Sequence, residues 1–298
     1  MITGEKIAEW KRDFVRHCTA QNKANSTIEV YWQSVVCFLR VFNTMSLDRI
    51  GWKQIADYIL QYDNSKTIEQ KRYAIQLFYH IVIGQKEKLK NMPHPKRERI
   101  IPQVLNIAEC YAIFSKIDNL KHKALIQLSY SCALRISEVL RIRVRHIDGK
   151  AGTLFIQQSK GAKDRLVPIP EDTMVLLRMY FKAYFKNYTS ETLLFRGQSK
   201  THDAYSEASI RSVLRRAAFK AKVLKKIKFH TLRHSRATHW YNADLQIRDI
   251  ASLLGHNNIK TTEIYIHTGI EQLQIKTTAA DHIIKSKLLE YQQKKITA

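Results

Sequence analysis

Cysteine, glycine, proline and acidic residues are all scarce in this chain of 298 residues. No stretch approaches the ~20 consecutive apolar residues of a membrane span. The N-terminal residues alternate charge with apolar side chains and lack the apolar core of a signal peptide. The four cysteines lie far apart without a CxxC pair, which argues against a zinc site and a disulfide framework. We therefore expect a reducing, cytoplasmic location and cysteines that serve as small core residues, namely Cys18, Cys37, Cys110 and Cys132.

The shortage of acid leaves a large excess of positive charge. There are 26 Asp and Glu against 50 Lys and Arg, so the formal net charge is +24. Such an excess indicates a polyanionic partner. An anionic membrane surface is the alternative, but it favours a basic block beside an apolar or lipidated segment, and the sequence has neither. With 45% hydrophobic residues, the chain can bury ordinary cores, and its length suits two domains.

The first domain is predicted to be a set of helices over residues 1–83. Apolar residues recur there at helical spacing, for example Ile7, Trp10 and Phe14. Residues 84–102 then contain three prolines and six Lys or Arg. Because proline at this density cannot continue a helix, we predict a linker here. Its basic residues either solvate the chain or contact DNA phosphates, and so basic a protein favours the phosphates.

A second domain is expected over residues 103–298. It is predicted to be mostly helical with a β-rich insert, so the fold class is mainly α with a small β-sheet. The insert is expected to hold three strands, at 144–147, 153–158 and 165–169, joined by turns at Asp148-Gly149 and at Ser159-Lys160-Gly161.

One stretch of the second domain is strongly basic. Residues 211–228 contain eight Lys or Arg and no acid, interleaved with apolar side chains such as Leu214 and Phe219. This pattern predicts an amphipathic helix that lies on a polyanion. A solvated face is the alternative, although such a face usually includes acidic partners.

Four short segments combine residue types that are found in active sites. In CALRISEVLRI, Arg135 follows an uncharged run and is expected where a buried helix reaches a cleft. In SKGAKDRLVPIP, Lys160 is expected at a hairpin tip. In HTLRHSRATH, His230 and Arg233 lie one helical turn apart on one face. The fourth segment, LLGHNNIKTTEIY, has a glycine that can end a helix, followed by two further candidates, His256 and Tyr265.

Each segment alone also has an ordinary structural interpretation. Arg135 can pair with Glu138, Lys160 can be a solvated hairpin lysine, and a lone tyrosine usually lies in a core. The third segment has histidines at a spacing that suggests a metal, but no carboxylate accompanies them as in HExxH. These histidines are His230, His234 and His239. The functional interpretation depends on all four segments occurring together and in this order.

With these four segments, the chain resembles the tyrosine recombinases of the integrase family, in the two-domain plan of Xer-type and phage-integrase-like members. The resemblance covers nearly the whole chain and is strongest over residues 130–267, where LGHNNIKTTEIYIH is close to the family's final motif. It implies an N-terminal helical core-binding domain that binds DNA and a C-terminal catalytic domain. Because no domain precedes the first helices, we expect the additional arm-site-binding domain of some phage integrases to be absent. By position in the motifs, the catalytic residues are Arg135, Lys160, His230, Arg233, His256 and Tyr265.

The resemblance also implies a chemistry that needs no metal, ATP or other cofactor. Tyr265 would attack the phosphodiester and form a 3′-phosphotyrosine, and four protomers would join two DNA sites. Two family positions differ here: Ala133 stands where glycine is common, and Arg236 replaces an apolar residue, where it would alter packing or contact DNA. Two alternatives remain open, a topoisomerase-like enzyme that nicks and closes one duplex, and a noncatalytic DNA-binding protein.

Overall fold

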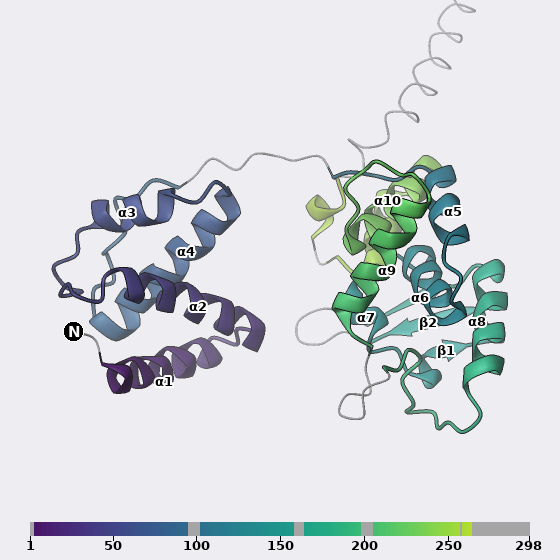
Figure 1. The fold of residues 1–298 in the computed structure, drawn as a ribbon, viewed down its shortest axis with the longest axis horizontal. Coiled ribbons are helices and arrows are strands. Elements are labelled where there is room, and N and C mark those ends of the chain that lie inside the picture. Colours follow the sequence, from purple (N-terminus) through teal and green to yellow (C-terminus); the bar gives the residue numbers. More distant parts are fainter. Residues whose placement is uncertain (1–2, 95–101, 158–163, 198–204, 257, 264–298) are drawn as a thin grey trace, which may run out of the picture. The chain divides into compact units, whose positions relative to one another are not determined.

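The computed structural model describes residues 3–94, 102–157, 164–197, 205–256 and 258–263. These ranges are mostly helical with one small sheet, which confirms the predicted fold class. The chain divides into two compact units, Met1–Ile100 and Ile101–Ala298 (Figure 1). Within the described ranges, no helix is both long enough and apolar enough to cross a membrane.

The first unit is a bundle of helices around one apolar core. Helix α2 packs against α4, and α1 packs against α2 and against the π-helix that continues α4. The predicted helical stripe is confirmed, because Phe14 is fully buried and Ile7 and Trp10 pack on the same core. The elements are α1 (Gly4–Ala20), α2 (Asn25–Val41), α3 (Trp52–Leu60), α4 (Ser65–Phe78) and η1 (Tyr79–Ile83).

Part of the predicted linker belongs to this first unit. Leu89 and Met92 are buried in its core, and Arg72 of α4 donates hydrogen bonds to their carbonyl oxygens, at 3.3 Å and 3.4 Å. Residues 84–94 are therefore folded against the bundle, contrary to the expectation of a linker that begins at residue 84. This segment is rich in lysine, but its two apolar side chains Leu89 and Met92 complete the core. The following residues, 95–101, lie outside the described ranges.

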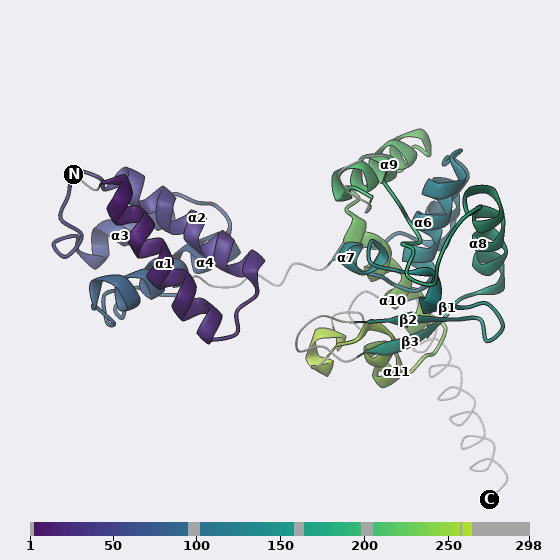
Figure 2. The same cartoon turned by 90° about the horizontal axis from the view of Figure 1, so that it is seen from below.

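In the second unit, helices surround a three-stranded antiparallel sheet in the order β1-β2-β3 (Figure 2). Helix α6 packs against α8 and α10, and α11 packs against α10 and β3. This arrangement brings the ends of α6 and α11 to α10. The elements are α5 (Ile107–Ser115), α6 (Leu120–Ser131), α7 (Ile136–Val139), η2 (Val144–His146), β1 (Ile147–Asp148), β2 (Thr153–Ile156), β3 (Arg165–Pro168), α8 (Glu171–Tyr184), α9 (Glu207–Lys220), α10 (Phe229–Asn242), α11 (Ile247–Leu254) and η3 (Ile259–Thr261).

The structure corrects the first of the three predicted strands. All three are present, but residues 144–146 form a 3₁₀ turn and β1 is only Ile147–Asp148. The apolar–basic alternation there does not distinguish a tight turn from an extended strand. The expected turn that includes Lys160 lies outside the described residues.

The basic stretch 211–228 also differs from its prediction. Helix α9 ends at Lys220, and Lys222 has a positive φ of 55°, so the chain turns before α10. Acidic partners come from outside the stretch: Glu207 pairs with Arg211, Asp118 with Lys220 and Glu109 with Lys225. The absence of acid within the sequence window therefore did not mean an absence of acidic partners.

Candidate active site

The end of α6 places Arg135. Helix α6 is closed by a left-handed residue, Ala133, whose φ is 49°. The Leu134 amide then donates to the Ser129 carbonyl at 2.8 Å, and the Ala133 amide donates to the Tyr130 carbonyl at 3.0 Å. These two bonds are the pattern of a helix end that normally favours glycine. After this reversal, Arg135 is the N-cap of α7. This confirms the prediction that Arg135 follows a buried helix.

Glu138 is the centre of the polar cluster that Arg135 joins. Its carboxylate is buried and accepts hydrogen bonds from the Arg135 Nη1 at 2.7 Å and from the Arg135 backbone amide at 2.8 Å. Arg165 adds two parallel bonds, at 3.1 Å and 2.9 Å, and the Arg233 Nη1 lies 3.8 Å away. Burial by itself raises the pKa of Glu138, but the hydrogen bonds and charge of Arg165, with Arg135 and Arg233, lower it to about 2.

Arg233 joins three segments of the unit. It lies on α10, is fully buried, and donates to the Ala133 carbonyl at 2.8 Å and to the Leu254 carbonyl at 2.7 Å. Its Nη2 lies 3.1 Å from the His256 Nε2. Arg233 therefore binds the two chain reversals that follow α6 and α11, and it holds them beside one another.

The end of α11 places His256 in the same way that the end of α6 places Arg135. Gly255 has a φ of 65°, and the His256 amide donates to the Ala251 carbonyl at 3.0 Å. This confirms the prediction that Gly255 ends a helix and that His256 follows in the turn. Because a guanidinium only donates, the His256 Nε2 accepts from Arg233, and its Nδ1 is left to donate to the Thr262 hydroxyl at 2.9 Å.

The histidines of this site are held in their neutral forms. Burial lowers the pKa of His230, and Arg233 and Arg135 lower it further. Burial lowers the pKa of His234 and of His256 to about 4, with further lowering by His230 and Arg233 at His234 and by Arg233 and Arg135 at His256. A neutral imidazole can accept a proton, so His230 has the state that a general base requires near pH 7.

Not all the histidines of α10 belong to this site. The rings of His230 and His234 meet edge to face at 4.4 Å, but His239 turns elsewhere. Its two ring nitrogens lie 2.7 Å from the Tyr130 hydroxyl and 2.9 Å from the Leu105 carbonyl. The three histidines that were considered as metal ligands therefore do not converge.

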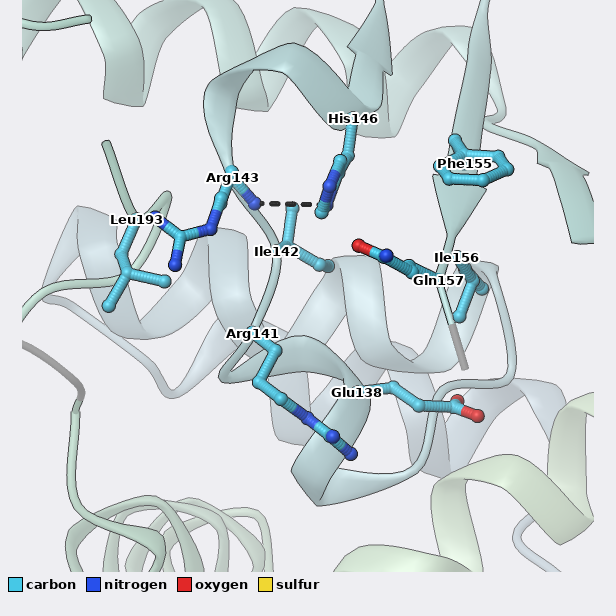
Figure 3. A pocket seen from close by; sticks show the side chains of 9 residues that line it. All are labelled: Glu138, Arg141, Ile142, Arg143, His146, Phe155, Ile156, Gln157 and Leu193. Atoms are coloured by element: carbon cyan, nitrogen blue, oxygen red, sulfur yellow. Dashed lines mark hydrogen bonds between the residues drawn. The ribbon is translucent and has the colours of Figure 1, made fainter. Parts of the chain in front are cut away.

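A pocket of about 240 Å³ opens beside Glu138 (Figure 3). Arg141 and Arg143 line it with apolar side chains, and the Arg143 amide donates to the His146 Nδ1 at 3.2 Å. Gln157, the residue after β2, also lines it and is the last described residue before the segment that contains Lys160. The pocket therefore extends from Glu138 to Gln157.

The structure brings together four of the six predicted catalytic residues, namely Arg135, His230, Arg233 and His256. Lys160 and Tyr265 lie outside the described residues. Sequence reasoning treated Glu138 only as an alternative partner of Arg135 and missed Arg165, which lies 27 positions from Glu138. Three guanidiniums against one carboxylate leave an excess of positive charge, which suits an anion.

The two departures from the motifs have different structural settings. Ala133 occupies the left-handed position that closes α6, which explains why glycine suits that place. The Arg236 guanidinium lies over the rings of Tyr130 and Trp240, at 5.4 Å and 5.2 Å. Of the two roles considered for Arg236, the structure therefore supports the one in packing.

Comparison with known proteins gives matches along most of the chain. Residues 99–271 match the Phage integrase family. A tyrosine recombinase of Pseudothermotoga lettingae is 27% identical over 277 residues, which are 88% of this chain and 94% of the relative. Tyrosine recombinase XerA of Thermococcus kodakarensis is 32% identical over 193 residues, 64% of this chain and 67% of the relative. A solved structure of XerH site-specific recombinase, in a post-cleavage complex with its palindromic difH substrate, shares the fold: the TM-score is 0.71 at 21% identity, over 91% of this chain and 85% of that one.

Proposed function

Because the chain belongs to the phage integrase family of tyrosine recombinases, we propose that it cleaves and rejoins DNA at specific sites through a phosphotyrosine on Tyr265. It is a tyrosine-type site-specific recombinase, an enzyme of DNA strand transfer. The observation that best supports the catalytic mechanism is the cluster around Glu138, in which Arg135, Arg233 and His256 form one positively charged site.

The arginines are assigned to the phosphate. As the nucleophile attacks, negative charge grows on the nonbridging oxygens, and a guanidinium offers these oxygens a planar set of charged donors. The Arg135 side chain is 35% exposed, so it is accessible to a phosphate, with Glu138 on its other side. Arg233 is fully buried behind the chain reversals that hold His256. We assign Arg233 and His256 to the same phosphate site, on its buried side.

The proton transfers are assigned to His230 and Lys160. The tyrosine hydroxyl must lose its proton to attack, and His230 is a neutral base beside the arginines. The 5′ oxygen of the broken strand must gain a proton to leave, and we assign that step to Lys160. The bond between the tyrosine oxygen and phosphorus forms as the bond from phosphorus to the 5′ oxygen breaks. Rejoining reverses both changes with another 5′ hydroxyl, so neither ATP nor a metal is required.

The proposal also extends to assembly and location. Double-stranded DNA is the partner, with four protomers joining two sites in the cytoplasm. The first unit would bind the DNA with residues 1–83, and the second, from residue 103, would perform catalysis. The net charge of +24 supports electrostatic binding to the phosphates of duplex DNA.

A pool of nicked duplexes with randomised sequence around the nick tests this function. Cleavage beside the nick releases a short DNA fragment that carries the 5′ hydroxyl, and this fragment diffuses away. The protein therefore stays covalently attached, and the attached ends can be sequenced. We expect a denaturant-stable adduct enriched in one sequence. No adduct would leave a noncatalytic DNA-binding protein. A plasmid with two copies of the enriched site then separates recombination from relaxation of supercoils, which would indicate the topoisomerase-like alternative.

A further inference from the structure

Among the three arginines around Glu138, Arg165 makes the most side-chain hydrogen bonds to the carboxylate. It is the first residue of β3, and its side chain is 5% exposed. Its Nη1 and Nη2 donate to the two oxygens of Glu138, and its Nε donates to the Leu253 carbonyl at 2.8 Å. Each of its three nitrogens thus has a partner within the protein.

Arg135 has the opposite character. Its side-chain bond is a single one, from Nη1 to the Glu138 Oε1, and no other side-chain partner of Arg135 is found among the described residues. About a third of the side chain is exposed. Arg165 therefore binds Glu138 with two parallel bonds, whereas Arg135 binds it with one and keeps donors for another anion.

We infer that Arg165 is a positioning residue for strand cleavage: it holds and neutralises Glu138, so that the Arg135 guanidinium stays available to the scissile phosphate. The inference rests on the proposed function. Arg165 itself would not touch the DNA, because two parallel hydrogen bonds hold its guanidinium against Glu138 and its Nε donates to the Leu253 carbonyl.

The physical reason lies in the competition for Arg135. A buried carboxylate that loses one guanidinium attracts the remaining cations more strongly, because burial makes an unpaired charge costly. Without Arg165, Glu138 would bind the Arg135 guanidinium through two parallel hydrogen bonds instead of one. The DNA phosphate would then lose the donors that it needs in the transition state.

A second bond extends this role to His256. Two consecutive carbonyls at the end of α11 are held by arginines, Leu253 by Arg165 and Leu254 by Arg233. The chain reversal at Gly255 follows directly and presents His256. Arg165 thus connects the start of β3 to Glu138 and to the helix end that places His256.

The test measures single-turnover cleavage of the duplex that is enriched from the randomised nicked pool, at saturating full-length protein. We expect Arg165→Gln to cleave about 10²-fold more slowly, as for a small misplacement of catalytic groups, with binding of the same duplex unchanged. Arg165→Lys keeps the charge but cannot bridge both Glu138 oxygens and the Leu253 carbonyl, so an intermediate rate is expected. It also serves as the second variant if Arg165→Gln does not fold.

Arg178→Gln is the matched control. Arg178 also binds a glutamate, Glu171, and a backbone carbonyl, that of Gly149, but its side chain is 55% exposed on α8. We expect this variant to cleave at the wild-type rate. A loss equal to that of Arg165→Gln would overturn the inference.

A double variant separates positioning from general structural support. If Arg165 acts through the charge of Glu138, the loss from Arg165→Gln should be smaller in the Glu138→Gln background than in the wild type, with only the part that depends on the Leu253 carbonyl remaining. Multiplying losses would overturn the inference, as would a wild-type rate for Arg165→Gln. These results leave the proposed function intact, whereas the absence of any adduct with the wild-type protein would refute the proposed function itself.

Discussion

The left-handed backbone at Ala133 can be examined by comparing two alanine-to-glycine substitutions around α6. Ala133 and Ala124 are both fully buried, but only Ala133 has a positive φ, of 49°. A residue with a Cβ is strained in this conformation by ~1–2 kcal/mol, and glycine relieves that strain. The comparison therefore isolates the strain from the loss of a buried methyl group.

The expected magnitudes follow from these settings. At Ala133, the relief of strain is offset by the loss of a buried methyl, worth ~0.8 kcal/mol. It is also offset by the greater freedom of glycine in the unfolded chain, worth ~0.4–1 kcal/mol. The free energy of unfolding of Ala133→Gly should therefore lie within ~1 kcal/mol of wild type. Ala124→Gly loses the methyl and ~1 kcal/mol of helix propensity without any relief, so we expect a loss of ~2 kcal/mol.

Urea unfolding followed by circular dichroism measures both variants in the same transition, because both positions belong to the second unit. Cleavage by Ala133→Gly should stay at the wild-type level, since the Ala133 carbonyl that binds Arg233 is retained. Equal destabilisation by the two substitutions would refute the reasoning, because it would mean that the reversal at the end of α6 is unstrained.

Three further predictions concern the catalytic cluster. Arg135→Lys and Arg233→Lys should each slow cleavage by ~10²–10³-fold with little loss of DNA binding in gel shifts, because lysine keeps the charge but not the planar donors; a wild-type rate would leave that arginine a structural role. Lys160→Ala should be slow on ordinary DNA and largely restored when sulfur replaces the bridging 5′ oxygen, whereas rescue of Lys163→Ala instead would move the proton donor. In urea titrations, the free energy of unfolding should fall as pH drops below about 4.5 toward the Glu138 pKa of about 2, because the folded protein stabilises that carboxylate in its charged form. Glu138→Gln should flatten this decline. An unchanged dependence of the unfolding free energy on pH would contradict the assignment.

Local features of the site could be predicted from the sequence. The uncharged run before Arg135 predicted a buried helix that ends shortly before this residue, and Gly255 predicted the reversal before His256. The spacing of His230 and Arg233 placed both on α10. In each case the signal lies within a few residues of the feature, where helix periodicity and helix-end chemistry act.

The features that were missed depend on contacts between distant positions. The pair of Glu138 and Arg165 spans 27 residues, and nothing local distinguishes this arginine from the other basic residues of so basic a chain. Leu89 and Met92 lie in a lysine-rich segment, so their burial becomes evident only when the first core is assembled. The acidic partners of the stretch 211–228 likewise come from α5, from the residues before α6 and from the start of α9.

The central claim is that Tyr265 takes the 3′ phosphate of the broken strand, and peptide mapping of the trapped adduct tests it most directly. The protein is reacted with the nicked duplex, the DNA is digested to a nucleotide stub, and mass spectrometry locates the modified peptide. We predict a nucleotide on Tyr265, attached through a 3′ phosphate, and no adduct with Tyr265→Phe despite normal binding to the duplex. A stub on another residue, attachment through a 5′ phosphate, or an undiminished adduct with Tyr265→Phe would contradict the account.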